Sequence, residues 1–160
     1  MRNGKASATA VVRRVGIVWE VLEVFPFPRW HPEELLTFYT KYKDMIQCVL
    51  LEQPFLSFTR RSVSQVGYTV LGRYLQTLDI LGIKYIEVTP REWQKEYGIK
   101  KTEQSSTKEQ SIAQSVLMTT NALNHIRYQK AGRVEHNDNY SDSILLATLA
   151  ERFEDKTNDK

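Results

Sequence analysis

A short apolar run that ends in a carboxylate places the strongest constraint on the fold of this chain. Residues 46–51 (IQCVLL) precede Glu52, and Pro54 ends the run two residues later. A short run rich in branched apolar residues and bounded by proline is typical of a buried strand. A carboxylate at the end of such a strand is costly to desolvate unless another group pairs with it, and a metal ion is a common partner. Glu52 is therefore the first candidate metal ligand.

The rest of the chain alternates between patterns typical of strands and of helices. Strands are expected over residues 6–12, 15–25, 46–52 and 83–88, and helices over residues 31–43, 62–81, 107–123 and 138–154. The first two strands are expected to form a hairpin that turns at Arg13 and Arg14. Thr89 and Pro90 are expected to begin a further short helix, and residues 125–139 are expected to be irregular. Strands that alternate with helices after a hairpin indicate an α/β fold, with a mixed central sheet and helices on both faces.

Length and composition restrict the class of protein. The 160 residues suit one domain, which we expect over residues 1–154, followed by a flexible tail over residues 155–160. The excess of 22 basic over 19 acidic residues is too small to identify a nucleic-acid partner. One cysteine, Cys48, excludes an intrachain disulfide, and its place in the apolar run favours simple burial. No apolar stretch approaches the ~18 residues of a membrane span, so we expect a soluble cytoplasmic protein.

A second acidic cluster precedes the last expected helix. Asp138 and Asp142 are four residues apart and would project from one face of that helix. In the simpler interpretation, Asp138 or Asn139 caps the helix and Asp142 is an acid favoured by the helix dipole. Together with Glu52, these acids could instead hold paired divalent ions, which stabilise the attacking and leaving oxygens in phosphodiester cleavage. Mg²⁺ suits such a site because it takes few carboxylates and keeps waters and substrate phosphates.

Several segments occur in an order that is shared with a known family. They are residues 51–54 (LEQP), the glycines of the helix 62–81, residues 81–83 (LGI), 88–95 (VTPREWQK), a lysine-rich stretch and 139–147 (NYSDSILLA), within about residues 4–152. In this combination the chain resembles the RuvC-type Holliday junction resolvases, most closely the phage-encoded branch. The resemblance implies an RNase H-like fold, a homodimer, and Mg²⁺- or Mn²⁺-dependent nicking of four-way or branched DNA. It also implies that Glu52 and Asp142 are catalytic metal ligands, together with Asp138 or Asn139.

The first strand departs from the family pattern. The family begins this strand with an Asp, whose place here falls on Met1 to Asn3, most closely on Arg2, and none of these residues is acidic. Either a few residues precede this sequence, or the site is rebuilt, or the protein binds junctions without cutting them. The alternatives to a resolvase are thus a catalytically impaired junction-binding protein of the same fold, and an RNase H-like protein-interaction scaffold whose acids only cap helices.

Basic residues near the expected site are candidate DNA contacts. Arg60 and Arg61 follow Glu52 closely in the sequence, and Lys100 and Lys101 follow the Trp93 segment. Such residues hold phosphates and supply affinity without sequence information. For Lys100 and Lys101, a solvated surface without a partner is an equal alternative.

Two further roles come from the resemblance. It places a basic residue near the scissile phosphate, for which Lys108 is the candidate, and an aromatic wedge at the junction centre, for which Phe58 is the first candidate and Phe55 the second. Core or dimer packing is the alternative for Phe58. The helix 62–81 is apolar on more than one face, which favours a homodimer across it, and its Gly67 and Gly72 are expected to allow close packing. Trp93 is expected in the core.

Overall fold

The computed structural model describes residues 7–27, 31–54 and 61–159, with the side chains of the last range described from residue 65. The chain divides into two compact units. The first unit comprises Met1–Phe27 and Gln94–Thr148, and the second comprises Pro28–Trp93 and Leu149–Lys160.

The first unit begins with an antiparallel hairpin of β1 (Ala8–Val15) and β2 (Val18–Pro26). The predicted turn at Arg13 and Arg14 is wrong, because both residues lie within the ladder, and Arg13 donates two hydrogen bonds of 3.0 and 2.8 Å to Glu20 opposite it. The chain turns instead beside Gly16, whose φ of +65° suits glycine. The antiparallel hairpin itself is confirmed.

The helix expected over residues 107–123 is two helices, α4 (Thr107–Met118) and α5 (Ala122–Ile126). The break occurs beside Asn121, whose side chain accepts a hydrogen bond from the Val21 backbone N–H at 2.8 Å and donates one to its carbonyl at 2.9 Å. Val21 then packs with Ala122, Ile126 and Ile144 in the core of this unit. A contact made by an asparagine across the fold thus ends the helical run.

A second hairpin occupies part of the segment that was expected to be irregular. It consists of β5 (Arg127–Lys130) and β6 (Arg133–His136), joined by a tight turn in which Ala131 and Gly132 both have positive φ, 49° and 77°. Positive φ at both central residues is the geometry of a two-residue hairpin turn. The prediction failed because these strands bury almost nothing and therefore carry no apolar alternation.

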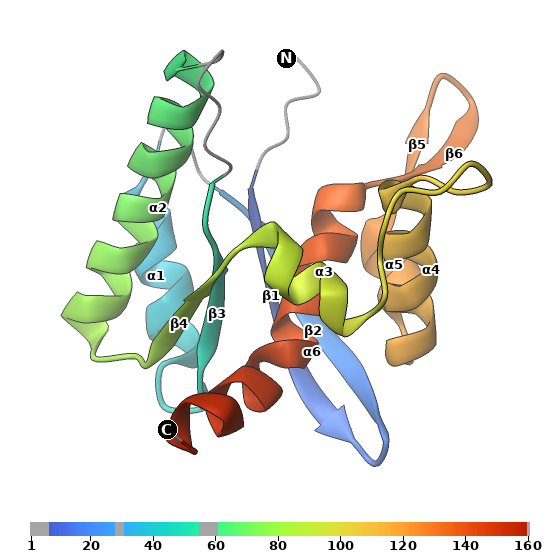
Figure 1. Ribbon diagram of the computed structural model, residues 1–160. Coiled ribbons are helices and arrows are strands. Elements are labelled where there is room, and N and C mark those ends of the chain that lie inside the picture. Colours follow the sequence, from blue (N-terminus) through green and yellow to red (C-terminus); the bar gives the residue numbers. More distant parts are fainter. Residues whose placement is uncertain (1–6, 28–30, 55–60, 160) are drawn as a thin grey trace. The chain divides into compact units, whose positions relative to one another are not determined.

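The second unit combines helices with a parallel strand pair (Figure 1). Its elements are α1 (Glu33–Tyr42), β3 (Val49–Glu52), α2 (Arg61–Leu81) and β4 (Tyr85–Val88). The helices α1 and α2 pack through apolar faces, and the rings of Tyr39 and Tyr74 meet edge to face with centroids 6.4 Å apart. Gly82, with a φ of +68°, follows the end of α2, a place and conformation typical of a glycine that ends a helix. The described strands pair in three two-stranded ladders, one parallel and two antiparallel, rather than in the one mixed central sheet that was expected. The α/β class itself is confirmed.

Two helices contribute residues to both units, α3 (Pro90–Glu96) and α6 (Asp138–Asn158). Thr89 caps α3 as predicted: its Oγ1 accepts a hydrogen bond from the Glu92 N–H at 3.2 Å, and the Glu92 carboxylate accepts one from the Thr89 N–H at 2.7 Å. α6 continues to Asn158, so most of the expected tail is helical. No helix within the described residues is long and apolar enough to cross a membrane.

The two glycines of α2 differ in their surroundings. A Cβ on Gly67 would lie 2.8 Å from the Cβ of Pro54, whereas a Cβ on Gly72 would meet no atom of the described residues within 4 Å. The predicted close packing therefore holds for Gly67 and is wrong for Gly72.

Candidate functional site

Glu52 is the last residue of β3, where it pairs in register with Val88 of β4. The indole N–H of Trp93 donates a hydrogen bond to its carboxylate. Trp93 is fully buried, as predicted, and the capped first turn of α3 fixes its position. The indole therefore holds the Glu52 carboxylate in a set orientation, a role that the sequence analysis did not assign to Trp93.

The environment of the Glu52 carboxylate opposes its ionisation. Glu52 as a residue is exposed, but its carboxylate is drawn against the buried indole. Burial raises the pKa of Glu52 above its ordinary value, and the hydrogen bond from Trp93 lowers it in part. A cation beside the carboxylate would favour the ionised form.

The residue that caps α6 is Asn137. Its side-chain oxygen accepts hydrogen bonds from the backbone N–H groups of Asn139 and Tyr140, at 3.0 and 3.2 Å. The interpretation of Asp138 or Asn139 as the capping residue is therefore wrong. Because Asn137 satisfies these backbone groups, the side chains of Asp138 and Asn139 are not needed to cap the helix.

Four of the predicted site residues line one small hollow in the first unit. The hollow has a volume of about 180 Å³ and is lined by Gln94, Thr107, Lys108, Asp138, Asn139 and Asp142. Lys108 comes from the first turn of α4, and its ammonium lies 3.9 Å from the Asp138 carboxylate. Asp138 and Asp142 thus line the same hollow, as residues on one helical face would.

A pair of buried serines holds the Asp142 carboxylate. Ser111 Oγ of α4 donates a 2.5 Å hydrogen bond to Asp142 Oδ1, and it lies 2.9 Å from Ser141 Oγ. Ser141 Oγ also donates to the Asp138 carbonyl at 2.8 Å. Both serines are almost completely buried. The sequence analysis missed them, although Thr107, Ser111 and Ser115 recur at helical spacing on α4.

The donors around the hollow fit a hard divalent cation. Two carboxylates and an amide offer oxygen atoms, which Mg²⁺ and Mn²⁺ prefer. Within either unit, the described residues contain no group of three or more His, Cys, Asp or Glu side chains arranged to hold a metal. The hollow therefore offers a partial ligand set, and Glu52 belongs to the other unit.

The other predicted contacts are only partly described. Lys100 and Lys101 are exposed, and the Gln110 side chain of α4 holds the Lys100 backbone through bonds of 3.0 and 2.5 Å. Arg61 begins α2, but its side chain is outside the described part of the structure. Phe55, Phe58, Arg60 and the residues Met1 to Asn3 also lie outside the described residues.

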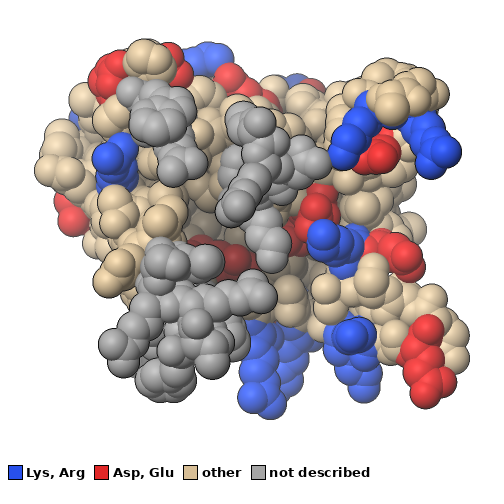
Figure 2. Space-filling model, turned by 90° about the horizontal axis from the view of Figure 1, so that it is seen from above, with Lys and Arg blue, Asp and Glu red and all other residues tan. Residues whose placement is uncertain are grey.

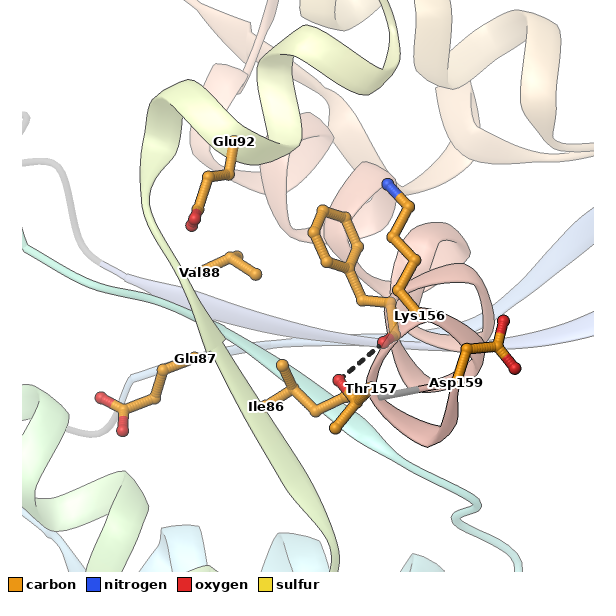
Figure 3. Close-up of a pocket in the computed structure, with 8 residues that line it drawn as sticks. Ile86, Glu87, Val88, Glu92, Lys156, Thr157 and Asp159 are labelled. Carbon is orange, nitrogen blue, oxygen red and sulfur yellow. Dashed lines mark hydrogen bonds between the residues drawn. The ribbon is translucent and has the colours of Figure 1, made fainter.

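A larger hollow of about 530 Å³ lies in the second unit (Figure 3). β4, α3 and α6 line it, and none of the predicted site residues is among its side chains. Thr157 donates to the Phe153 carbonyl at 3.0 Å, and Glu92 already caps α3. In Figure 3 the carboxylates of Glu87 and Asp159 point in opposite directions, so no set of chemical groups converges there.

Charged side chains are dispersed on the face drawn in Figure 2. Where that view shows described residues, Lys and Arg side chains lie in separate groups, with acidic and uncharged residues beside them. This dispersion agrees with the small net charge of +3.

Comparison with known proteins identifies the fold. No protein-family model and no curated protein matches this chain. The solved structure of T. thermophilus RuvC in complex with Holliday junction substrate is similar, with a TM-score of 0.62 and 14% identity over 95% of this chain and 94% of that chain. A second structure, of Thermus thermophilus RuvC, has a TM-score of 0.47 and 13% identity over 92% and 88%. The first match shows that this chain has an RNase H-like α/β fold, as predicted.

Proposed function

We propose that this chain is a Holliday junction resolvase, a metal-dependent endonuclease that nicks four-way DNA junctions. The observation that carries the proposal is the hollow at the start of α6, where Asp138, Asn139 and Asp142 meet Lys108. The fold supports it, because the similar solved structure is a RuvC in complex with a Holliday junction substrate. Metal-assisted phosphodiester cleavage uses oxygen ligands of this kind to hold the metal.

The proposed ligands are Glu52 and Asp142, together with Asp138 or Asn139. Mg²⁺ or Mn²⁺ at such a site would supply an activated water and stabilise charge on the phosphate. The chain's own residues hold the ligands in place: Ser111 orients the Asp142 carboxylate, and Trp93 orients that of Glu52. Lys108 is proposed to hold an oxygen of the scissile phosphate.

DNA outside the cleaved bond would contact the remaining candidates. Lys100, Lys101, Arg60 and Arg61 are proposed to bind backbone phosphates, and Phe58 to open base stacking at the junction centre. Apolar wedges of this kind have precedent in other DNA-binding proteins.

A homodimer is part of the proposal. Resolution of a junction takes two symmetric nicks, and a two-fold dimer presents two equal sites. The helix α2 offers a surface for it, since Val66, Tyr68 and Ile80 are 56%, 43% and 67% exposed. These large apolar side chains extend the apolar surface of α2 beyond the face that packs on α1.

A second candidate function is junction binding without cleavage. It is favoured by the residues Met1 to Asn3, where Arg2 stands at the place of an acidic ligand in the resembled family. A ligand set without that acid would bind metal weakly and still leave the DNA-binding residues intact.

The test uses a labelled synthetic four-way junction with Mg²⁺ or Mn²⁺, beside a linear duplex and a sample without metal. If the protein is a resolvase, paired, metal-dependent nicks should appear near the crossover. Glu52→Gln should abolish nicking and keep junction binding, whereas Glu87→Gln, on the neighbouring strand, should leave both unchanged. Tight junction binding without nicks would support the second candidate. Equal, weak binding of junction and duplex would contradict both and favour a protein-interaction scaffold.

A further inference from the structure

The hairpin of β5 and β6, here named the basic ribbon (residues 127–136), has no evident role in the core of its unit. Every residue of β5 is exposed, and in β6 only Glu135 is half-buried. In Figure 1 the ribbon projects beyond α4 and α5 of the same unit. A two-stranded ribbon that buries so little gains little stability from packing, so packing does not determine which residues it carries.

The charges of the basic ribbon are arranged against its own stability. Lys130 lies directly opposite Arg133. Like charges at directly opposed positions destabilise an antiparallel pair. No ion pair joins Arg127, Lys130 or Arg133 to another described residue.

The hairpin of β1 and β2 in the same unit shows the usual arrangement. There an exposed arginine, Arg13, lies opposite Glu20 and forms an ion pair with it, in which two guanidinium nitrogens donate to one carboxylate oxygen. In the basic ribbon, the one carboxylate is that of Glu135, which accepts a 2.9 Å hydrogen bond from the Tyr128 hydroxyl. The cations at the ribbon tip, Lys130 and Arg133, are thus available to bind a polyanion.

The ribbon is tied directly to the candidate site. The Asn137 N–H donates a 2.8 Å hydrogen bond to the Ile126 carbonyl, which closes the base of the ribbon, and Asp138 follows at once. Four residues per strand, at about 3.3 Å each, place the tip about 13 Å from the base. Phosphates along one DNA strand are spaced by about 3.4 Å of helix axis, so this reach corresponds to about four nucleotides.

We propose that the basic ribbon binds the phosphate backbone of a duplex arm of the DNA substrate, about four nucleotides from the cleaved bond, through Lys130 and Arg133 at its tip. The proposal rests on the proposed function, which supplies DNA as the partner. A two-stranded β-ribbon fits a DNA groove in size, and neutralisation by phosphate relieves the repulsion between the two tip cations.

The test compares a ribbon variant, Lys130→Gln/Arg133→Gln, with a control variant, Lys41→Gln/Lys43→Gln, which removes the same charge from exposed positions of α1 and its end. Binding of a fluorescent four-way junction is measured by anisotropy without divalent metal, between about 50 and 300 mM salt. Each phosphate contact changes the slope of log K against log[salt] by about 0.9, which corresponds to about eightfold in affinity at 0.1 M salt. The ribbon variant should therefore bind about 8- to 60-fold more weakly, with a slope smaller by about 0.9 to 1.8.

Controls separate this effect from damage to the fold and from failure of the proposed function. The ribbon variant loses a repulsive pair, so its Tm should equal or exceed that of the wild type, and the control variant should bind as the wild type does. Hydroxyl-radical footprinting should show lost protection about four nucleotides from the crossover nick. Wild-type affinity and slope in the ribbon variant would overturn the ribbon proposal alone. A wild-type protein that does not prefer junctions would overturn the proposed function and the ribbon proposal with it.

Discussion

Replacement of Ser111 by alanine tests whether α4 positions the Asp142 carboxylate. The change removes one hydroxyl from a buried site, and with it the 2.5 Å hydrogen bond to Asp142. Ser141 Oγ loses its 2.9 Å contact with Ser111 but keeps its 2.8 Å bond to the Asp138 carbonyl, so its hydroxyl still has a partner. The effect therefore reports mainly on the bond to the carboxylate.

Ser115, one turn later on α4, provides a matched control. It is also fully buried, but its hydroxyl donates to the neutral carbonyl of Ile112, at 2.8 Å. A hydrogen bond to a charged group contributes about 1.5–3 kcal/mol to the free energy of unfolding, and a neutral one about 0.5–1.5 kcal/mol. Ser111→Ala should thus destabilise the protein by about 1 kcal/mol more than Ser115→Ala, which is roughly 2–4 °C in Tm for a chain of this size.

Metal affinity distinguishes positioning from general stability. Loss of a hydrogen-bond partner of a metal ligand typically weakens metal binding by about 10- to 100-fold. Titration of Mn²⁺, followed by the electron paramagnetic resonance signal of the free ion, should show this loss in Ser111→Ala and not in Ser115→Ala. Urea unfolding followed by circular dichroism gives the stabilities. Equal stability and equal Mn²⁺ affinity in the two variants would refute the positioning role of Ser111.

Three further predictions concern single positions. Burial raises the pKa of Glu52, so its ionised form destabilises the fold as pH rises through that pKa. Glu52→Gln should therefore have a higher free energy of unfolding than the wild type at pH 7, but an equal one near pH 3. Urea melts that show the same difference at both pH values would count against this. Burial, with a smaller contribution from a neighbouring carboxylate, raises the pKa of Cys48 to about 11. The rate at which iodoacetamide alkylates Cys48 should therefore still increase above pH 9, where the rate for free cysteine levels off. A plateau of the Cys48 rate near pH 9 would contradict this prediction. Gly72→Ala should stabilise the protein by up to about 1 kcal/mol through helix propensity. Gly67→Ala should be about 1–3 kcal/mol less stable than Gly72→Ala through overpacking, because its Cβ would meet Pro54 at 2.8 Å. Thermal melts of both variants check this order of stability.

Elements with a buried apolar face could be predicted from the sequence. The helices α1 and α2 and the strands β3 and β4 carry such faces, and each lies within a few residues of its expected bounds. Thr89 and Pro90 also gave a local signal, since the cap and the first residue of a helix depend on neighbouring backbone groups. Local chemistry and periodic burial are both encoded in short segments.

Elements shaped by distant contacts could not be predicted in this way. The break between α4 and α5 depends on Asn121, whose partner Val21 is 100 residues away in the sequence. The basic ribbon buries no apolar face, so its sequence lacks the alternation of apolar and polar residues that predicts a strand. Cys48 was expected to be simply buried, but it is half-buried, and its thiol lies 3.7 Å from the Val49 carbonyl.

The candidate site shows the same division. The sequence alone identified the candidate oxygen ligands, because Glu52 ends an apolar strand and Asp138 and Asp142 share one helical face. Only the tertiary structure decided that Asn137 takes the capping role and that Ser111 reaches Asp142. Hydrogen bonds of this kind depend on how elements from separate parts of the chain are oriented when they pack. A sequence pattern indicates which face of a helix is buried, but not which atom contacts that face.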